Sequence, residues 1–280
     1  MTILTPQMIF QFLPPRDPES HKGSYGRVLA VCGCTQYRGA AALSVLGALR
    51  AGAGIVTLAA AEPVIASVAA RILEATFLPL PDGSGLAQTA QKASVCLGGC
   101  GREADDATAA LMRTLLTEAA GTVVLDAGGL CSLADEPETL HRAAGRLIIT
   151  PHPGEMARLC GCTVQEITAD PAGAASAFAR KTAAVVVLKG HRTHIAAPDG
   201  MLYENRTGNA GLARGGSGDV LAGMIAGYAA QGLTPLHAAL CGVYLHGLAA
   251  DACAARLSQQ GMLPEDILTD LCAVYLANGR

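Results

Sequence analysis

Arg27-Val28-Leu29-Ala30-Val31-Cys32-Gly33 is a continuous apolar run that ends in a glycine. Such a run is typical of a strand that is buried on both faces of a parallel sheet. The chain continues with a helical stretch over residues 39–51 and a second apolar run over residues 54–58. Strand, helix and strand in this order form a βαβ unit, so we expect two parallel strands joined by a helix that packs on one face of the sheet.

The same alternation continues along most of the chain. We expect further strands at residues 76–78, 94–97, 122–126, 146–150 and 184–189, and helices at residues 6–13, 63–71, 105–119, 172–181, 220–231, 235–257 and 264–277. Segments 192–197 and 201–205 flank the turn Pro198-Asp199-Gly200, which predicts a hairpin at the sheet's edge. Apolar runs that alternate with helices predict an α/β fold with a doubly wound, mostly parallel sheet and helices on both faces. No linker marks a boundary, so we expect one domain over residues 1–280.

The composition excludes several classes of partner. The chain has 280 residues, 51% of them hydrophobic, with a mean hydropathy of +0.35, so it can bury a large core. Charged residues make up 15% and aromatic residues 4%, the formal net charge is -3, and no long basic run occurs. Nucleic-acid binding is therefore not expected, because both a phosphate-neutralising patch and stacking platforms are lacking.

The apolar segments do not indicate secretion or membrane insertion. The first six residues have neither a basic region nor a long apolar stretch, so no secretion signal is expected there and the simplest location is the cytoplasm. Residues 39–61 resemble a membrane span in length, but Arg50 lies near their middle, and a buried helix followed by a buried strand explains them better.

Ten cysteines are scattered through the chain. The most closely spaced pairs, Cys32-Gly33-Cys34 and Cys160-Gly161-Cys162, lack the Cys-x-x-Cys spacing of a zinc knuckle. We therefore expect free, buried thiols rather than disulfides or metal ligands, and we assign no residue as a metal ligand from the sequence.

Glycine-rich and polar residues follow most of the expected strands. In an open α/β sheet, ligands bind beyond the carboxyl ends of the strands, so these segments should meet at one edge and form a site. They are residues 33–35, 98–101, 126–129, 150–155 and 189–193.

A further glycine-rich stretch, Gly208-Asn209-Ala210-Gly211-Leu212-Ala213-Arg214-Gly215-Gly216-Ser217-Gly218-Asp219, leads into the helix expected at residues 220–231. Glycines let backbone amides approach an anion, and a helix N-terminus adds donors and a favourable dipole, so the stretch could cradle a phosphate. Asp219 would then be a candidate base for a hydroxyl brought to that phosphate. A plain glycine-rich connection with Asp219 as the helix cap is the alternative.

Three strand-end residues allow two interpretations each. Lys189 could reach phosphate oxygens or extend into solvent. His152, between two prolines, could be a positioned functional side chain or the cap of a helix. Asp126 could face a ligand or magnesium, or cap the turn that follows it.

Five motifs in order resemble the NAD(P)H-hydrate dehydratase family across nearly the whole chain. Each motif alone is weak, whereas their order and spacing are highly specific. They are Lys22-Gly23-Ser24-Tyr25-Gly26-Arg27-Val28, Gly39-Ala40-Ala41 with residues 49–54, Thr150-Pro151-His152-Pro153-Gly154-Glu155, Val187-Leu188-Lys189-Gly190, and residues 209–223. The resemblance implies a ribokinase-like fold, in agreement with the expected sheet.

The resemblance also implies a repair reaction. Hydrated NADH or NADPH (NADHX or NADPHX) would be dehydrated to the working cofactor at the expense of ADP, giving AMP, or of ATP. The terminal phosphoryl group would pass to the ring hydroxyl and leave as phosphate, a far better leaving group than hydroxide. Mg²⁺ is expected beside the phosphates, and a homo-oligomer, such as a tetramer, is expected from the family.

Residue by residue, the resemblance makes Asp219 the catalytic base, with the amides of residues 216–218 as the anion hole. It implies that Ala40, Gly101, His152 and Asp219 contact the hydrated dinucleotide. It implies a nucleotide site formed by Lys189, Gly190, His191, Arg192, Thr193, Asn209, Gly215, Gly216, Ser217 and Gly218.

Two motifs depart from the family pattern. Where the family often has Gly-Pro-Gly-Leu-Gly, this chain has Cys100 in place of proline and Glu103 in place of the last glycine. Its Lys-Gly-x-x-Thr motif contains His191 and Arg192, which could alter the grip on the nucleotide. Many bacterial relatives also carry an N-terminal epimerase domain, for which we expect no room here, so both epimers would be used only with an epimerase encoded elsewhere.

Two other functions remain open on the residues alone. A ribokinase-fold kinase for a small molecule, such as a vitamin precursor, would have a similar glycine-rich turn and aspartate. A nucleotide sensor would bind without turnover, although Asp219 stands where a phosphoryl transfer would need it.

Overall fold

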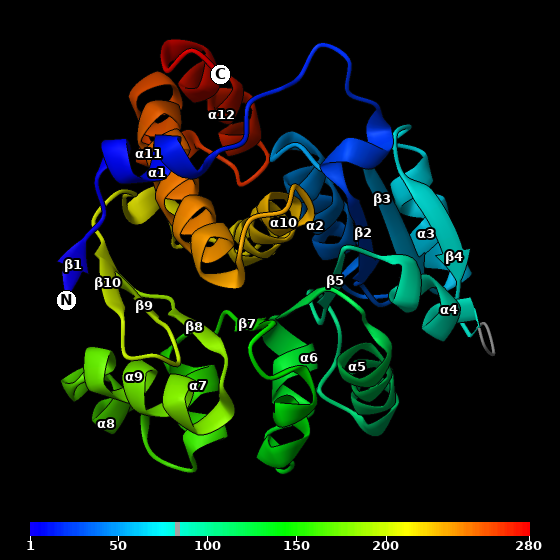
Figure 1. Ribbon diagram of the computed structural model, residues 1–280, viewed down its shortest axis with the longest axis vertical. Helices are drawn as coiled ribbons and strands as arrows, with labels where there is room; N and C mark the ends of the chain where they lie inside the picture. Colours follow the sequence, from blue (N-terminus) through cyan, green and yellow to red (C-terminus); the bar gives the residue numbers. More distant parts are fainter. Residues whose placement is uncertain (82–84) are drawn as a thin grey trace.

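The computed structural model describes residues 1–81 and 85–280 and shows three layers, with one twisted sheet between two layers of helices (Figure 1). The sheet order is β1-β10-β9-β8-β7-β6-β5-β2-β3-β4, and the strands from β8 to β4 in this order are parallel. The strands are β1 Thr2–Ile3, β2 Arg27–Val31, β3 Ile55–Ala60, β4 Thr76–Pro79, β5 Val95–Gly98, β6 Thr122–Leu125, β7 Leu147–Ile149, β8 Val185–Leu188, β9 Thr193–Ala196 and β10 Leu202–Asn205.

The α-helices are α1 Pro6–Phe12, α2 Arg38–Arg50, α3 Glu62–Ala69, α4 Gly85–Lys92, α5 Asp106–Glu118, α6 Ala127–Cys131, α7 Pro153–Cys160, α8 Val164–Ala169, α9 Pro171–Thr182, α10 Ser217–Ala230, α11 Pro235–Gly261 and α12 Asp266–Ala277. Three short 3-10 helices occur at Lys22–Tyr25, Pro137–Ala143 and Ala210–Leu212 within the described ranges.

Each face of the sheet buries its own core. Val28 and Ala30 of β2 pack with α2, α3, α10, α11 and α12, whereas Leu29 and Val31 pack with α4, α5, α7 and α9. Successive side chains of a strand point to opposite faces, so a run that is apolar at every position can be buried on both sides. This is the physical basis of the doubly wound fold that the sequence predicted, and the prediction is confirmed.

Close packing of α2 against α10 fixes the position of the helix that begins at the glycine-rich stretch. A Cβ atom at Gly223 would lie 2.2 Å from the backbone oxygen of Ser44, so only glycine allows this approach. The two helices run side by side in Figure 1. Because both helices are packed so tightly, the N-terminus of α10 has a well-defined place above the sheet.

The strand order reverses between β2 and β5. The chain builds β2, β3 and β4 outward in one direction, then returns to the other side of β2 with β5, β6, β7 and β8. The segments that follow β2 and β5 lead to helices on opposite faces of the sheet, α2 and α5, and such a switch point is where ligands bind in open α/β sheets.

Several predicted elements need correction. The hairpin β9–β10 is present, but it is not the edge of the sheet, because β1 pairs with β10 in parallel. Strand β1 was not predicted, because it has two residues and pairs with the distant Tyr203 and Glu204, which leaves no local signal in the sequence. Helix α10 begins at Ser217, three residues before the predicted start, so Asp219 lies in its first turn.

Helices α4, α6 and α8 were not predicted, and α7 was considered only as the helix that His152 could cap. They are short, and α6 contains Gly128 and Gly129, which lower helix propensity. Helix α11 runs past the predicted end at residue 257 to Gly261, with non-helical torsion angles at Ser258. The remaining predicted strands and helices are present within a few residues of their expected ends.

Among the described residues, one helix, α11, has the length and composition of a membrane span, with a mean hydropathy of 1.4 in its most apolar window. Of that window, 72% is buried inside the fold. A core helix of a soluble protein passes the same test, and burial against the sheet accounts for the apolar composition. Residues 39–61, which also resembled a span, form α2 and β3, as expected.

Candidate active site

The N-terminus of α10 offers an anion cradle. Gly216 precedes the helix with a φ of +103°, a conformation that side chains disfavour, and a Cβ there would lie 2.6 Å from Leu43. Within the described chain, no side chain caps this helix. Of the first-turn amides, that of Ser217 donates to the backbone oxygen of Arg214 at 3.3 Å, whereas those of Gly218 and Asp219 lack helical acceptors of their own, so these two can receive an anion.

Lys189 lies beside this helix start, directly after β8. Its Nζ atom is 3.5 Å from the place where a Cβ on Gly218 would stand, so a side chain at that position would crowd the amine. Nζ also donates to Oδ1 of Asp126 at 2.7 Å. The predicted meeting of a lysine with the glycine-rich turn is therefore seen, but the lysine already has a carboxylate partner.

Asp126, directly after β6, accepts two short hydrogen bonds on one oxygen and a longer one from a thiol on the other. Its Oδ1 accepts from both Lys189 Nζ and Thr150 Oγ1, each at 2.7 Å. Its Oδ2 accepts from the Cys100 thiol, with Sγ at 3.7 Å. The carboxylate does not cap α6, although Asp126 is the cap residue, so that alternative is wrong. Asp126 instead places a negative charge in the site.

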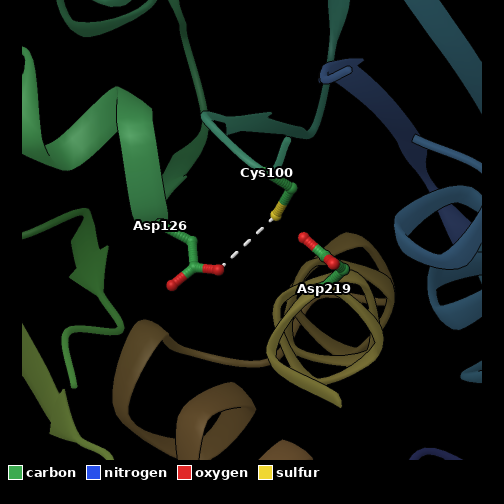
Figure 2. Close-up of side chains that lie close together, drawn as sticks. All are labelled: Cys100, Asp126 and Asp219. Atoms are coloured by element: carbon green, nitrogen blue, oxygen red, sulfur yellow. Dashed lines mark hydrogen bonds between the residues drawn. The ribbon is translucent and has the colours of Figure 1, made fainter. Parts of the chain in front are cut away.

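Cys100, Asp126 and Asp219 converge from three elements, as Figure 2 shows. One ligand atom from each lies within 4.8 Å of the others. Cys100 and Asp126 follow the neighbouring strands β5 and β6, and Asp219 approaches from the first turn of α10. The thiol points between the two carboxylates.

Burial and like charge perturb this cluster. Burial first, and then the negative charge of Asp126, raise the pKa of Asp219 to about 7, while Lys189 opposes the rise. A hydrogen bond with the Cys32 thiol, burial and nearby negative charges raise the pKa of Cys100 well above its usual range. A carboxyl group with a pKa near neutral pH suits a general base.

Lys189 stays protonated in this setting. Burial lowers its pKa, but the charges of Asp126 and Glu155 outweigh that effect, so the pKa is raised overall. Burial raises the pKa of Glu155, and the charge of Lys189 opposes it. The Nζ atom of Lys189 and Oε2 of Glu155 are 3.8 Å apart, so the three groups form one charge network.

His152 caps α7. Its Nδ1 accepts from the backbone amides of Gly154 and Glu155 at 3.0 and 3.3 Å. Glu155 Oε2 in turn accepts from the backbone amide of His152 at 2.8 Å, which completes a capping box. Its Nε2 lies 3.3 Å from Oε1 of Glu155, but the ring is 56% exposed, so its exposed part can still contact a ligand. Capping is thus observed, and substrate contact stays a prediction.

Ala40 and Gly101 meet at the switch point of the sheet. A Cβ on Gly101 would lie 2.5 Å from the Cβ of Ala40, and Gly101 has a φ of +64°. The strand-end loop and the first turn of α2 therefore close together without a side chain between them. The structure brings these two predicted substrate residues side by side.

The other predicted nucleotide residues form a second group. Gly190, His191 and Arg192 make the turn from β8 to β9, and Thr193 opens β9. Arg192 Nη1 lies 3.4 Å from Glu204 Oε1, so its guanidinium is directed toward β10. A Cβ on Gly215 would meet no atom within 4 Å, so that part of the cradle is open.

The side chain of Asn209 makes hydrogen bonds within the fold. Its Oδ1 accepts from Gly211, and its Nδ2 donates to Ala250 and to Asp251 Oδ1. Asp251 Oδ2 also accepts from the Gly208 amide at 2.9 Å. Asn209 thus shapes the glycine-rich stretch through α11. Sequence reasoning missed Asp251, which is one acidic residue in a long helix and has no local signal.

The ten cysteines are all free. Five of them are buried, but Cys160 is exposed and four are partly exposed, so the expectation of buried thiols holds for half of them. Sequence reasoning noted Cys100 only as a departure from a motif. Its place between two carboxylates depends on the register of β5 and β6, which the sequence does not reveal.

A model of the NAD(P)H-hydrate dehydratase family matches residues 28–272. The chain belongs to this family. The matched region runs from β2 into α12 and includes all the site residues described above. The resemblance inferred from the five motifs is therefore confirmed.

Two relatives and one solved structure show the extent of this family likeness. The ADP-dependent (S)-NAD(P)H-hydrate dehydratase of Bacillus subtilis is 37% identical over 94% of this chain and 94% of its own length. The bifunctional NAD(P)H-hydrate repair enzyme of Moorella thermoacetica is 43% identical over 91% of this chain. A crystal structure of the ADP/ATP-dependent dehydratase from Bacillus subtilis, co-crystallised with ATP and Mg²⁺, has a TM-score of 0.87 at 36% identity and covers 99% of this chain and 98% of that chain.

The bifunctional members of the family are longer than this chain. The chain spans about half the length of the Moorella thermoacetica enzyme, at 50% of that protein. The structure of a ribokinase-like superfamily protein from Enterococcus faecalis has a TM-score of 0.89 at 26% identity and covers 99% of this chain and 95% of that chain. This match confirms the predicted ribokinase-like arrangement of sheet and helices.

Proposed function

We propose that this chain dehydrates hydrated NADH or NADPH to the working cofactor, with ADP or ATP as phosphoryl donor, and is a carbon–oxygen lyase. The observation that carries the proposal is the placement of Asp219 in the first turn of α10, a turn that no side chain of the described residues caps and whose Gly218 lies beside the Lys189 amine. A base and an anion cradle in one turn suit the transfer of a phosphoryl group to a hydroxyl.

In the first step, Asp219 accepts the proton of the ring hydroxyl as that oxygen attacks the terminal phosphorus of the nucleotide. The phosphorus–oxygen bond to the leaving nucleotide breaks, giving AMP when the donor is ADP. The raised pKa of Asp219, about 7, makes its carboxylate a stronger base than an ordinary aspartate. Amides at residues 216–218 hold the transferred group.

In the second step, phosphate leaves with the electrons of its carbon–oxygen bond. The adjacent ring carbon loses a proton to solvent, and the double bond of the dihydronicotinamide is restored. Phosphate is a better leaving group than hydroxide, which is the chemical reason to consume a nucleotide. Lys189 supplies positive charge beside the cradle, and Asp126 and Glu155 keep that lysine protonated and in place.

Mg²⁺ fits the donor atoms present. It prefers oxygen ligands and usually binds through one or two carboxylates together with substrate phosphates and water. Asp126 directs Oδ2 into the site, where its one partner in the described residues is the Cys100 thiol, whereas Oδ1 is taken by Thr150 and Lys189. When bound, the ion would neutralise charge on the phosphates, and Asp126 is the residue that would hold it.

The two ligands would occupy different sides of the cradle. We propose that Ala40, Gly101 and His152 contact the hydrated dinucleotide, because the first two close the switch point and the third exposes its imidazole edge. The β8–β9 turn from Lys189 to Thr193, with Asn209 and the glycines before α10, would hold the adenine nucleotide. A structure of the complex with a non-hydrolysable ATP analogue would test which of these two sets of residues binds the adenine nucleotide.

The proposal includes three further properties. Residues 1–280 would act as one domain, because a single sheet unites them. A cytoplasmic location fits a repair enzyme for a cytoplasmic cofactor, and a homo-oligomer, such as a tetramer, is expected from the family resemblance. Light scattering on the purified protein measures the oligomeric mass, and a monomeric mass would contradict the last expectation.

The test separates the dehydratase from a small-molecule kinase and from a sensor. Purified protein is incubated with hydrated NADH and with ADP or ATP, and the absorbance of reduced nicotinamide is followed. Recovery of that absorbance supports the dehydratase. A stable phosphate ester of the ring hydroxyl would indicate a kinase, and nucleotide binding without any turnover would indicate a sensor; either result overturns the proposal.

A further inference from the structure

The cluster of Cys100, Asp126 and Asp219 contains one feature that phosphoryl transfer does not use, namely a thiol. Cys100 is fully buried, and its Sγ atom lies 3.7 Å from Asp126 Oδ2 (Figure 2). One atom from each of the three side chains lies within 4.8 Å of the others. A sulfur and two carboxylate oxygens therefore surround one small space.

These separations match those around a tetrahedral zinc ion. Zinc binds thiolate sulfur at about 2.3 Å and carboxylate oxygen at about 2.1 Å, so a tetrahedral angle places the two ligand atoms roughly 3.6 Å apart. The distance between Cys100 Sγ and Asp126 Oδ2 is 3.7 Å without any movement. The Asp219 carboxylate lies within reach of the third position.

Asp126 is already oriented as a metal ligand would be. Thr150 Oγ1 and Lys189 Nζ both donate to its Oδ1 at 2.7 Å, so Oδ2 is left facing the cluster. Outer hydrogen bonds of this kind fix the direction of ligand carboxylates and add to metal affinity. The carboxylate is 3% exposed, so little ordering is needed when a cation binds.

Charge and softness select the type of cation. With Cys100 bound as thiolate, the three ligands carry three negative charges against the single positive charge of Lys189, which favours a divalent ion. Thiolate is a soft ligand that suits zinc and other thiophilic ions, whereas magnesium and calcium take oxygen ligands. The sulfur thus distinguishes this cluster from a magnesium site on phosphates.

We propose that Cys100, Asp126 and Asp219 form a binding site for a thiophilic divalent cation, with Zn²⁺ as the best fit, and that the bound cation inhibits the enzyme. Three protein ligands leave a fourth position for water or a substrate oxygen. The Cys100 thiol proton passes to solvent on binding. Binding itself is independent of the proposed function, whereas inhibition rests on it, because the cation occupies the carboxylate of Asp219.

The binding test uses Co²⁺ as a spectroscopic probe. The protein is freed of metal with EDTA in a Cys160→Ser/Cys162→Ser background, which removes an exposed and a partly exposed thiol elsewhere. We expect one equivalent of Co²⁺ to produce a thiolate-to-cobalt charge-transfer band, and Zn²⁺ to displace it. Cys100→Ser, which keeps a donor for Asp126, should abolish the band. A missing band, or an equal band in Cys100→Ser, would overturn the site.

A second variant tests the orientation of the ligand carboxylate. Thr150→Val removes one of the two donors to Asp126 Oδ1 and leaves all three ligands in place. We expect Zn²⁺ affinity, measured by displacement of Co²⁺, to fall roughly 10- to 100-fold, as for other outer-sphere changes. Unchanged affinity, with circular dichroism showing an intact fold, would refute a role for Asp126 as ligand.

Inhibition is measured as the ratio of activities with and without Zn²⁺ within each variant. One equivalent of Zn²⁺ should suppress the activity of the parent protein. The Cys100→Ser variant should need at least a tenfold higher Zn²⁺ concentration for the same inhibition, and Mg²⁺ should not inhibit either protein. Zinc bound through Cys100 without loss of activity would overturn the inhibitory role. No activity even in metal-free protein, together with a normal cobalt band, would count against the proposed function and leave the binding site intact.

Discussion

Replacing Asp219 with asparagine should remove activity and stabilise the fold at the same time. Asp219 would be the general base of the phosphoryl transfer, and such groups contribute about 10²- to 10⁴-fold to rate. Its carboxylate is also held in a partly buried place beside Asp126, which raises its pKa to about 7. Asparagine has nearly the same shape but carries no charge, so it relieves the repulsion and the burial of charge together.

The sign of the stability effect follows from the two pKa values. In the unfolded chain Asp219 titrates near its ordinary value of 3.8, and in the folded protein near 7, so the folded state binds the extra proton between these values. Stability of the wild type therefore falls as pH rises from about 4 to 7 and is constant above that. A difference of about three pH units corresponds to about 4 kcal/mol at pH 8.

The assay is urea unfolding of wild type and Asp219→Asn in EDTA at pH 8 and pH 5. We expect the variant to be more stable by up to about 4 kcal/mol at pH 8, and by less than half of that at pH 5. Asp106→Asn serves as the matched control, since that aspartate is exposed in the first turn of α5. The reasoning would be refuted if the variant were less stable than the wild type at pH 8, or if its free energy of unfolding rose equally at both pH values.

Three other substitutions test the remaining parts of the site and fold. Lys189→Met should destabilise the protein by about 3 to 5 kcal/mol in urea unfolding, because it leaves two buried carboxylates without their cation, and should weaken nucleotide binding in calorimetry. Unchanged stability would contradict this network. Gly101→Ala should lower kcat/KM at least tenfold, because the new Cβ would lie 2.5 Å from Ala40; an active, normally folded variant would contradict the close approach. Arg256→Met should cost roughly 1 kcal/mol at pH 7 and less at pH 3, because its hydrogen bonds lower the pKa of Asp270, and that contribution is lost as pH falls below the unfolded value. An equal cost at both pH values in urea unfolding would exclude the ion pair.

The order of strands and helices could be predicted because burial leaves a plain pattern. The run from Arg27 to Gly33 is apolar at every central position, since β2 is covered on both faces. The start of α10 could not be located as well, because Gly215, Gly216 and Gly218 indicate a turn by composition, although tertiary packing makes residues 217–219 helical. Strand β1 was not predicted, because a two-residue strand that pairs with β10 depends wholly on contacts distant in sequence.

The location of the site could be predicted from the sequence, but the contacts between its side chains could not. Parallel strands bring their carboxyl ends together, so Asp126, Lys189 and the turn before Asp219 were expected at one edge, and they lie there. Which groups pair was not predictable, because distances between side chains depend on strand register and helix tilt. Lys189 binds Asp126 rather than standing free for a phosphate, and Cys100 reaches between two carboxylates.

The stoichiometry of the reaction tests the central claim most directly. Hydrated NADH is incubated with the protein, ADP or ATP and Mg²⁺, and reduced nicotinamide and inorganic phosphate are measured in the same sample. We predict one phosphate released for each NADH recovered, no recovery without nucleotide, and loss of both products in Asp219→Asn. Recovery of NADH without phosphate release, or full turnover in Asp219→Asn, would contradict phosphorylation-assisted dehydration at this site.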